Sequence, residues 1–164
     1  MKDSESSRLA DFAMAIRGST MKRLRSVPPG HENWRPTADS LSIADIAQHL
    51  IDADQWLFAK LADPSLPSIK AVAGSAVIAS RSEFEFLLDR LEQLGSERAR
   101  LLSELSASEL EQAIQDDRFG GPVSVWWVIV RGNLDHEAHH RGQLATYIRI
   151  IRTGTAPEGS SDVS

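Results

Sequence analysis

The stretch DHEAHHRGQLATYIR, residues 135–149, combines three histidines with apolar residues at helical spacing. At about 100° of rotation per residue, positions three or four apart fall on one face of a helix. On this helix His136 and His140 share a face at the edge of the apolar stripe, and His139 points outward. The stripe predicted for the whole segment comprises Trp126, Ile129, Val130, Leu144, Ile148 and Ile151. The pattern therefore predicts a long amphipathic helix that presents two histidines side by side.

Two imidazoles four residues apart can chelate one metal ion, because one helical turn brings their nitrogens within reach of a common centre. A tight site usually needs a third ligand, and the other histidine in a predicted helix is His49. It too lies at the edge of an apolar stripe, formed by Ile43, Ile46, Leu50, Ala53 and Leu57. Spacing alone leaves open the alternative that these histidines are hydrogen-bonded or solvated boundary residues.

Prolines and glycines divide the chain into four helix-sized segments. These span about 6–25, from Ser42 to just before Pro64, 78–105 and 123–152. Ser42 followed by Asp45 is typical of a helix N-cap with an acidic first turn. Between the third and fourth segments we expect a short helix and a turn at DDRFGGP, residues 116–122.

The connection between the second and third segments is long. The loop DPSLPSIKAVAGSAV, residues 63–77, exceeds what a simple hairpin between two helices needs. We therefore predict an all-α fold, a four-helix bundle with a long crossover connection, over a single domain at residues 1–152. Residues 153–164 contain almost nothing to bury, so a disordered C-terminal tail is expected there.

Composition narrows the classes of partner. The chain has 164 residues and a net charge of -5, which argues against a nucleic-acid partner. Its longest apolar run, VWWVIV at residues 125–130, is too short to span a bilayer, so no membrane partner is expected. There are no cysteines, which excludes disulfides and thiolate ligands and suits a cytoplasmic protein.

Three stretches together resemble the DinB-like (YfiT-like) superfamily of metal-dependent four-helix-bundle proteins. They are NWRP at residues 33–36, SLSIADIAQHL at 40–50 and DHEAHHRGQLATYIR at 135–149, and the resemblance extends over about residues 5–152. It implies that His49, His136 and His140 are metal ligands and that the metal is a divalent transition ion, zinc or nickel. It also implies a bundle with a long crossover.

Four further residues are candidates for roles beside the metal. Glu137 falls on the core face, where it could orient a ligand, pair with an arginine from another helix, or extend its carboxylate to solvent. Asp52 is a candidate to hold a ligand or to act as a base. Gln143 and Tyr147 could line a substrate pocket, as could Trp56, although packing is the default role for a tryptophan.

Relatives in the resembled family include thiol S-transferases with bacillithiol- or mycothiol-type cofactors and mycothiol-dependent maleylpyruvate isomerases. Three neutral imidazoles leave a coordination position open, as in catalytic metal sites. We therefore expect a metal-dependent enzyme of the thiol S-transferase or small-molecule hydrolase type. A low-molecular-weight thiol would serve as co-substrate, since the chain has no thiol of its own. The alternative is a non-catalytic metal- or ligand-binding stress-response protein.

We also predict a homodimer. The third and fourth helices have more apolar positions than the core needs, and relatives in the resembled family commonly associate through helix faces.

Overall fold

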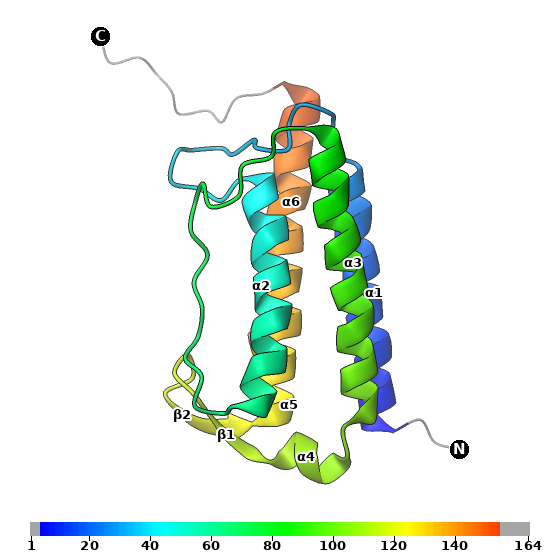
Figure 1. The fold of residues 1–164 in the computed structure, drawn as a ribbon, viewed down its shortest axis with the longest axis vertical. Coiled ribbons are helices and arrows are strands. Elements are labelled where there is room, and N and C mark those ends of the chain that lie inside the picture. Colours follow the sequence, from blue (N-terminus) through cyan, green and yellow to red (C-terminus); the bar gives the residue numbers. More distant parts are fainter. Residues whose placement is uncertain (1–3, 155–164) are drawn as a thin grey trace.

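Four long helices lie side by side in the computed structural model, which describes residues 4–154 (Figure 1). They are α1 (Glu5–Arg25), α2 (Ile43–Ala62), α3 (Arg81–Glu104) and α6 (Asp135–Thr153). Helices α1 and α6 run upward in Figure 1, and α2 and α3 run downward. Residues 63–80 return along the outside of α2 to the start of α3, so the predicted all-α bundle with a long crossover is confirmed. None of the described helices is long and apolar enough to cross a membrane.

Serine side chains fix where the helices begin. Ser42 and Asp45 form a reciprocal capping box at the start of α2, which satisfies two backbone N–H groups that the first turn leaves free. Ser80 caps α3 by accepting from the backbone N–H of Glu83, so α3 begins at Arg81 rather than near residue 78 as apolar spacing predicts. Gly154, with φ of 64°, ends α6 in the left-handed conformation that favours glycine. Residues 155–164, the greater part of the predicted tail, lie outside the described residues.

A small hairpin follows α3 at the base of the bundle (Figure 1). The short helix α4 (Ala107–Glu111) leads into β1 (Ala113–Asp116), which pairs antiparallel with β2 (Gly121–Ser124). Ala113 lies opposite Ser124 and Asp116 opposite Gly121. The predicted turn at residues 116–122 is therefore part of a β-hairpin, which the sequence analysis did not predict.

The prediction of one regular helix over residues 123–152 is wrong. It consists of α5 (Val125–Ile129), the π-helical turn η1 (Val130–Leu134) and α6. A π-turn holds one more residue than an α-turn, so it rotates everything before it relative to everything after it. Val125 and Val128, which precede η1, are therefore buried, whereas the predicted stripe residues Trp126 and Val130 are partly exposed.

The core has two apolar parts with a charged layer between them. The upper part includes Met21, Leu24, Ile46, Leu50, Leu88, Leu91, Leu144 and Ile148. The lower part includes Leu9, Ala13, Ile16, Leu57, Leu102, Val128, Ile129 and Leu134. At the height where these parts meet, each long helix contributes one fully buried charge: Arg17 from α1, Asp54 from α2, Arg98 from α3 and Glu137 from α6.

This charged layer is closed by short ion pairs. Arg17 donates to Asp54 at 2.7 Å and to Glu137 at 2.8 Å. Arg98 donates to Asp54 at 2.9 Å and to Glu137 at 2.8 Å. Asn133 of η1 completes the layer by accepting from Arg98 at 3.0 Å and donating to Asp54. Each helix therefore has a fixed rotation about its axis, because turning any of them would leave a buried charge unpaired.

Burial alone would raise the pKa of Glu137, but Arg98 and Arg17 outweigh it and lower the pKa to about 2. The carboxylate therefore stays charged at neutral pH. The layer also needs room, and Gly95 of α3 provides it. A β-carbon at this position would come within 2.7 Å of Cγ of Arg17.

Replacing Glu137 by Gln should lower the free energy of unfolding by about 3–5 kcal/mol, because it leaves two buried arginines short of a counter-charge. Urea denaturation of the metal-free protein measures this. Glu92→Gln is the matched control, because the Arg25–Glu92 pair is about half exposed and should contribute no more than about 1 kcal/mol. Equal and small losses in both variants would contradict this account of the layer.

Candidate metal centre

Three histidine rings converge in the seam between α2 and α6. Nε2 of His136 lies 2.9 Å from Nε2 of His49 and 3.0 Å from Nε2 of His140. Each ring offers one nitrogen to a group whose members all lie within 4.8 Å of one another. His49 and His140 are buried and His136 is partly buried. These are the three histidines that the sequence singled out.

The charged layer explains why these rings face one another. On α6, Glu137 points into the layer, and His136 and His140 are turned away from it toward α2. On α2, Asp54 points into the same layer, and His49 lies five residues earlier on the side that faces α6. The ion pairs therefore set the rotation of both helices that carry the rings.

Gln143 fixes the protonation of one ring. Its Oε1 lies 2.7 Å from Nδ1 of His140, so Nδ1 carries the proton and donates to the amide oxygen. Nε2 of His140 then has a free lone pair that points at the other rings. The sequence placed Gln143 in a pocket wall, whereas the structure places it behind His140, where it orients the ring.

The donor set fits a metal ion. Nε2 of His136 can carry at most one proton, so it cannot hydrogen-bond favourably to two neighbouring rings while they remain neutral acceptors. A cation at the common point resolves the conflict. Two nitrogens each about 2.05 Å from one ion would be about 2.9 Å apart at a right angle, close to the observed contacts.

The three histidine rings stay neutral at pH values well below those at which an ordinary histidine takes up a proton. Burial, followed by the neighbouring His140 and His49, lowers the pKa of His136 to about 3. Burial also lowers the pKa of His140 to about 4, against the opposing effect of the hydrogen bond that its ring donates to Gln143. The pKa of His49 is lowered by burial as well. Neutral imidazole is the form that binds metal, so the rings are ready to bind at neutral pH.

The other predicted site residues lie farther out. His139 is exposed, in keeping with the helical-wheel prediction. Asp52 is also exposed, and it accepts from Nε2 of Gln48 at 2.9 Å. Among residues 4–154 no hydrogen bond joins it to a histidine ring. Its charge nevertheless acts on His49, whose pKa it raises against the effect of burial.

The two aromatic candidates pack in the apolar core of the bundle. Tyr147 is buried and packs edge-on against Trp34, with ring centroids 5.3 Å apart, and burial raises its pKa. Trp56 is buried, and its Nε1 donates to the carbonyl oxygen of Pro67 at 2.7 Å. It lies on the same side of α2 as His49 but two turns later, about 10 Å along the helix axis.

The crossover is tied to α2 on both sides of His49. One turn before His49, the Asp45 carboxylate accepts from the backbone N–H groups of Gly74 and Ala76, each at 2.8 Å. Two turns after it, Trp56 holds Pro67. The segment between these ties therefore passes along the side of α2 that carries the histidine, as the path of the crossover in Figure 1 indicates.

The residues that the sequence analysis missed are the members of the charged layer other than Glu137, namely Arg17, Asp54, Arg98 and Asn133. Arg98 lies on the same helical stripe as the buried Leu91, Leu94 and Leu102. Arg17 likewise falls between the buried Ile16 and Met21. A charge inside an apolar stripe was the available signal, and Glu137 was recognised by it with pairing to an arginine as one of its alternatives.

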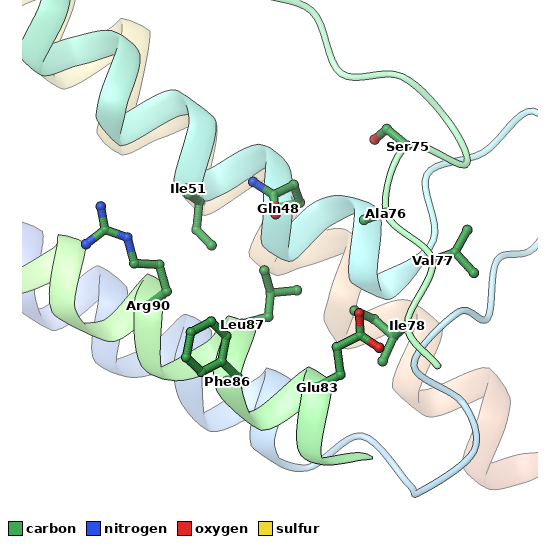
Figure 2. A pocket seen from close by; sticks show the side chains of 10 residues that line it. All are labelled: Gln48, Ile51, Ser75, Ala76, Val77, Ile78, Glu83, Phe86, Leu87 and Arg90. Atoms are coloured by element: carbon green, nitrogen blue, oxygen red, sulfur yellow. The ribbon is translucent and has the colours of Figure 1, made fainter. Parts of the chain in front are cut away.

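A groove on the opposite side of α2 is separate from the histidines. It has a volume of about 450 Å³ and lies between α2, the end of the crossover and α3 (Figure 2). Its lining residues are Gln48, Ile51, Ser75, Ala76, Val77, Ile78, Glu83, Phe86, Leu87 and Arg90. Gln48 and Ile51 point away from the side of α2 that carries His49, so this groove does not lead to the rings.

Comparison with known proteins places the chain in a family. The sequence pattern of the DinB superfamily matches residues 15–144, so the chain belongs to that superfamily. The crystal structure of a DinB-like protein from Bacillus subtilis is similar to it, with a TM-score of 0.64 at 17% identity. That similarity covers 92% of this chain and 94% of the other, and at this identity it shows the shared fold alone. The chain has no match among curated proteins.

The metal-free protein should lose stability as the pH falls below about 6.5, the ordinary pKa of an unfolded histidine. The folded-state pKa values of His136 and His140 are about 3 and about 4, so the unfolded chain takes up protons first. Each ring then contributes a slope of up to about 1.4 kcal/mol per pH unit. Urea unfolding with a chelator, between pH 7 and 5, measures this slope.

The variant with both His136→Gln and His140→Gln should show a shallower slope, and His139→Gln should keep the slope of the wild type. A double variant that loses stability with acid as steeply as the wild type would show that the two rings are not held neutral.

Proposed function

We propose that this member of the DinB superfamily binds one divalent transition-metal ion, zinc or nickel, through His49, His136 and His140. The observation that carries the proposal is the approach of three Nε2 atoms, with contacts of 2.9 and 3.0 Å about His136. Rings that serve packing alone have no reason to direct their lone pairs at one point. Three protein ligands leave part of the coordination sphere to water or substrate, which favours catalysis over a structural role.

We further propose that the protein is a metal-dependent enzyme of the thiol S-transferase or small-molecule hydrolase type. A bound divalent ion would supply either a water of lowered pKa or a substrate thiol held as thiolate. The thiol would come from a low-molecular-weight co-substrate, since the chain has no cysteine. The absence of cysteine also suits a reducing cytoplasm, where such thiols are abundant.

The chain's own residues divide the remaining work. Gln143 would keep His140 in the tautomer whose Nε2 is free, and loss of such a partner usually costs about 10–100-fold in metal affinity. Asp52 is our candidate base, because its side chain is exposed about one turn from His49 and its charge acts on that ring. The charged layer would keep the rings in place without contacting substrate.

Purified protein should hold about one metal ion per chain, and His136→Ala should abolish uptake while the bundle stays folded, because the side chain lies outside the apolar core. Elemental analysis with circular dichroism measures both. His139→Ala is the matched control, since this neighbouring ring is exposed, and it should bind metal normally. Normal uptake by His136→Ala would overturn the proposed ligand set.

The same variants separate an enzyme from a metal-binding protein without activity. Metal-loaded wild type, incubated with a small thiol and an aryl halide, should consume thiol faster than His136→Ala does. Full metal loading without turnover of thiols or of activated esters would favour the alternative of a non-catalytic metal- or ligand-binding stress-response protein.

We propose that the protein forms a homodimer through exposed apolar side chains on its helices. Phe86 of α3 is 78% exposed, and Trp127 of α5 is 39% exposed. Large exposed aromatic residues are typical of contact surfaces. Light scattering should give twice the chain mass of 18.0 kDa, and Phe86→Ser should reduce that mass. A monomer mass that does not change with concentration would contradict the dimer.

A further inference from the structure

Arg118 lies at the lower end of the histidine cluster, although it comes from the turn of the hairpin. Its guanidinium lies over the ring of Trp56, with Cζ 4.5 Å from the centroid. It also packs against Gly132, where an added β-carbon would lie 3.1 Å from Cζ of the arginine. Trp56 follows His49 by two turns and Gly132 precedes His136 by about one turn, so both helices place Arg118 at the same end of the cluster.

The guanidinium is held in place but is not saturated. Nε and Nη2 donate to the two oxygens of Asp116 at 2.9 and 2.7 Å, and Nη1 donates to the carbonyl oxygen of Gly132 at 2.9 Å. A guanidinium has five N–H donors, so two remain without a partner among residues 4–154. The Asp116 side chain is fully buried, whereas that of Arg118 is 29% exposed. Arg118 is therefore a fixed, partly exposed cation with two unused N–H donors.

We propose that Arg118 binds the carboxylate of the small molecule that occupies the open side of the metal centre. A carboxylate has two oxygens that can accept from the free N–H groups of one guanidinium. The buried Asp116 and the Trp56 ring keep the guanidinium from folding away. This inference rests on the proposed metal site, because the ligand would lie between Arg118 and the metal.

A role in ligand binding and a role in folding make opposite predictions for metal affinity. Arg118 adds positive charge near a centre that is to hold a divalent cation, so removing that charge should leave metal affinity unchanged or raise it. The same change should weaken the binding of an anion. A residue that merely stabilises the hairpin would weaken both together when replaced.

The test uses cobalt(II)-loaded protein, whose visible absorption reports both metal uptake and the binding of acetate as the carboxylate probe. Arg118→Gln should bind cobalt at least as tightly as the wild type and bind acetate about tenfold more weakly or worse. Arg118→Lys keeps the charge without the planar fork, so about a threefold loss is expected. The matched control is Arg100→Gln on α3, whose exposed side chain pairs with Glu104 and should leave acetate binding unchanged.

Arg118→Gln leaves Asp116 buried without its partner, so the variant Arg118→Gln with Asp116→Asn provides a charge-balanced second measurement. If the single variant unfolds by circular dichroism, the double variant decides. Equal acetate affinity in the wild type and the folded variant would overturn the role of Arg118 while the metal site stands. A wild-type protein that binds no cobalt would overturn the metal site and this inference together.

Discussion

Arg17, Asp54, Arg98 and Glu137 meet in the middle of the bundle, one from each long helix, and every cation there bonds to both anions. A buried layer of this kind adds little net stability, because removing four charges from water costs about as much as their attraction returns. Its effect is on arrangement. A helix that rotated or slid by one turn would leave a charge unpaired between two apolar clusters. The layer therefore favours one packing of the four helices over alternative packings.

The histidines depend on this layer although none of them belongs to it. Glu137 lies between His136 and His140 in the sequence and points inward, so its ion pairs direct both rings toward α2. The π-turn η1 serves the same arrangement, because it brings Asn133 into the layer while the apolar residues of α5 stay in the lower core. A metal centre built this way has its geometry set by the bundle before an ion arrives, which lowers the cost of ordering the ligands on binding.

Helical periodicity was sufficient to predict the four long helices and the two histidines that share a face, because both are local properties of the sequence. The prediction that His49 meets His136 rested on a family resemblance and on the position of each histidine at the edge of an apolar stripe. The π-turn could not be read from the sequence, since its hydrogen-bond register depends on Asn133 reaching partners on other helices. The role of Gln143 was missed for a similar reason. Its position one turn after His140 is equally compatible with a pocket wall and with a bond to the ring.

X-ray absorption spectroscopy of the metal-loaded protein tests the central claim most directly, because it reports the number and distance of the atoms bound to the ion. We predict three imidazole nitrogens at about 2.0–2.2 Å, with the remaining positions filled by light atoms from solvent that an added small anion displaces. Imidazole scattering that requires fewer than three rings would contradict it. A set of coordinating atoms that no added ligand changes would also contradict it, because the ion would then have no coordination position open to a substrate.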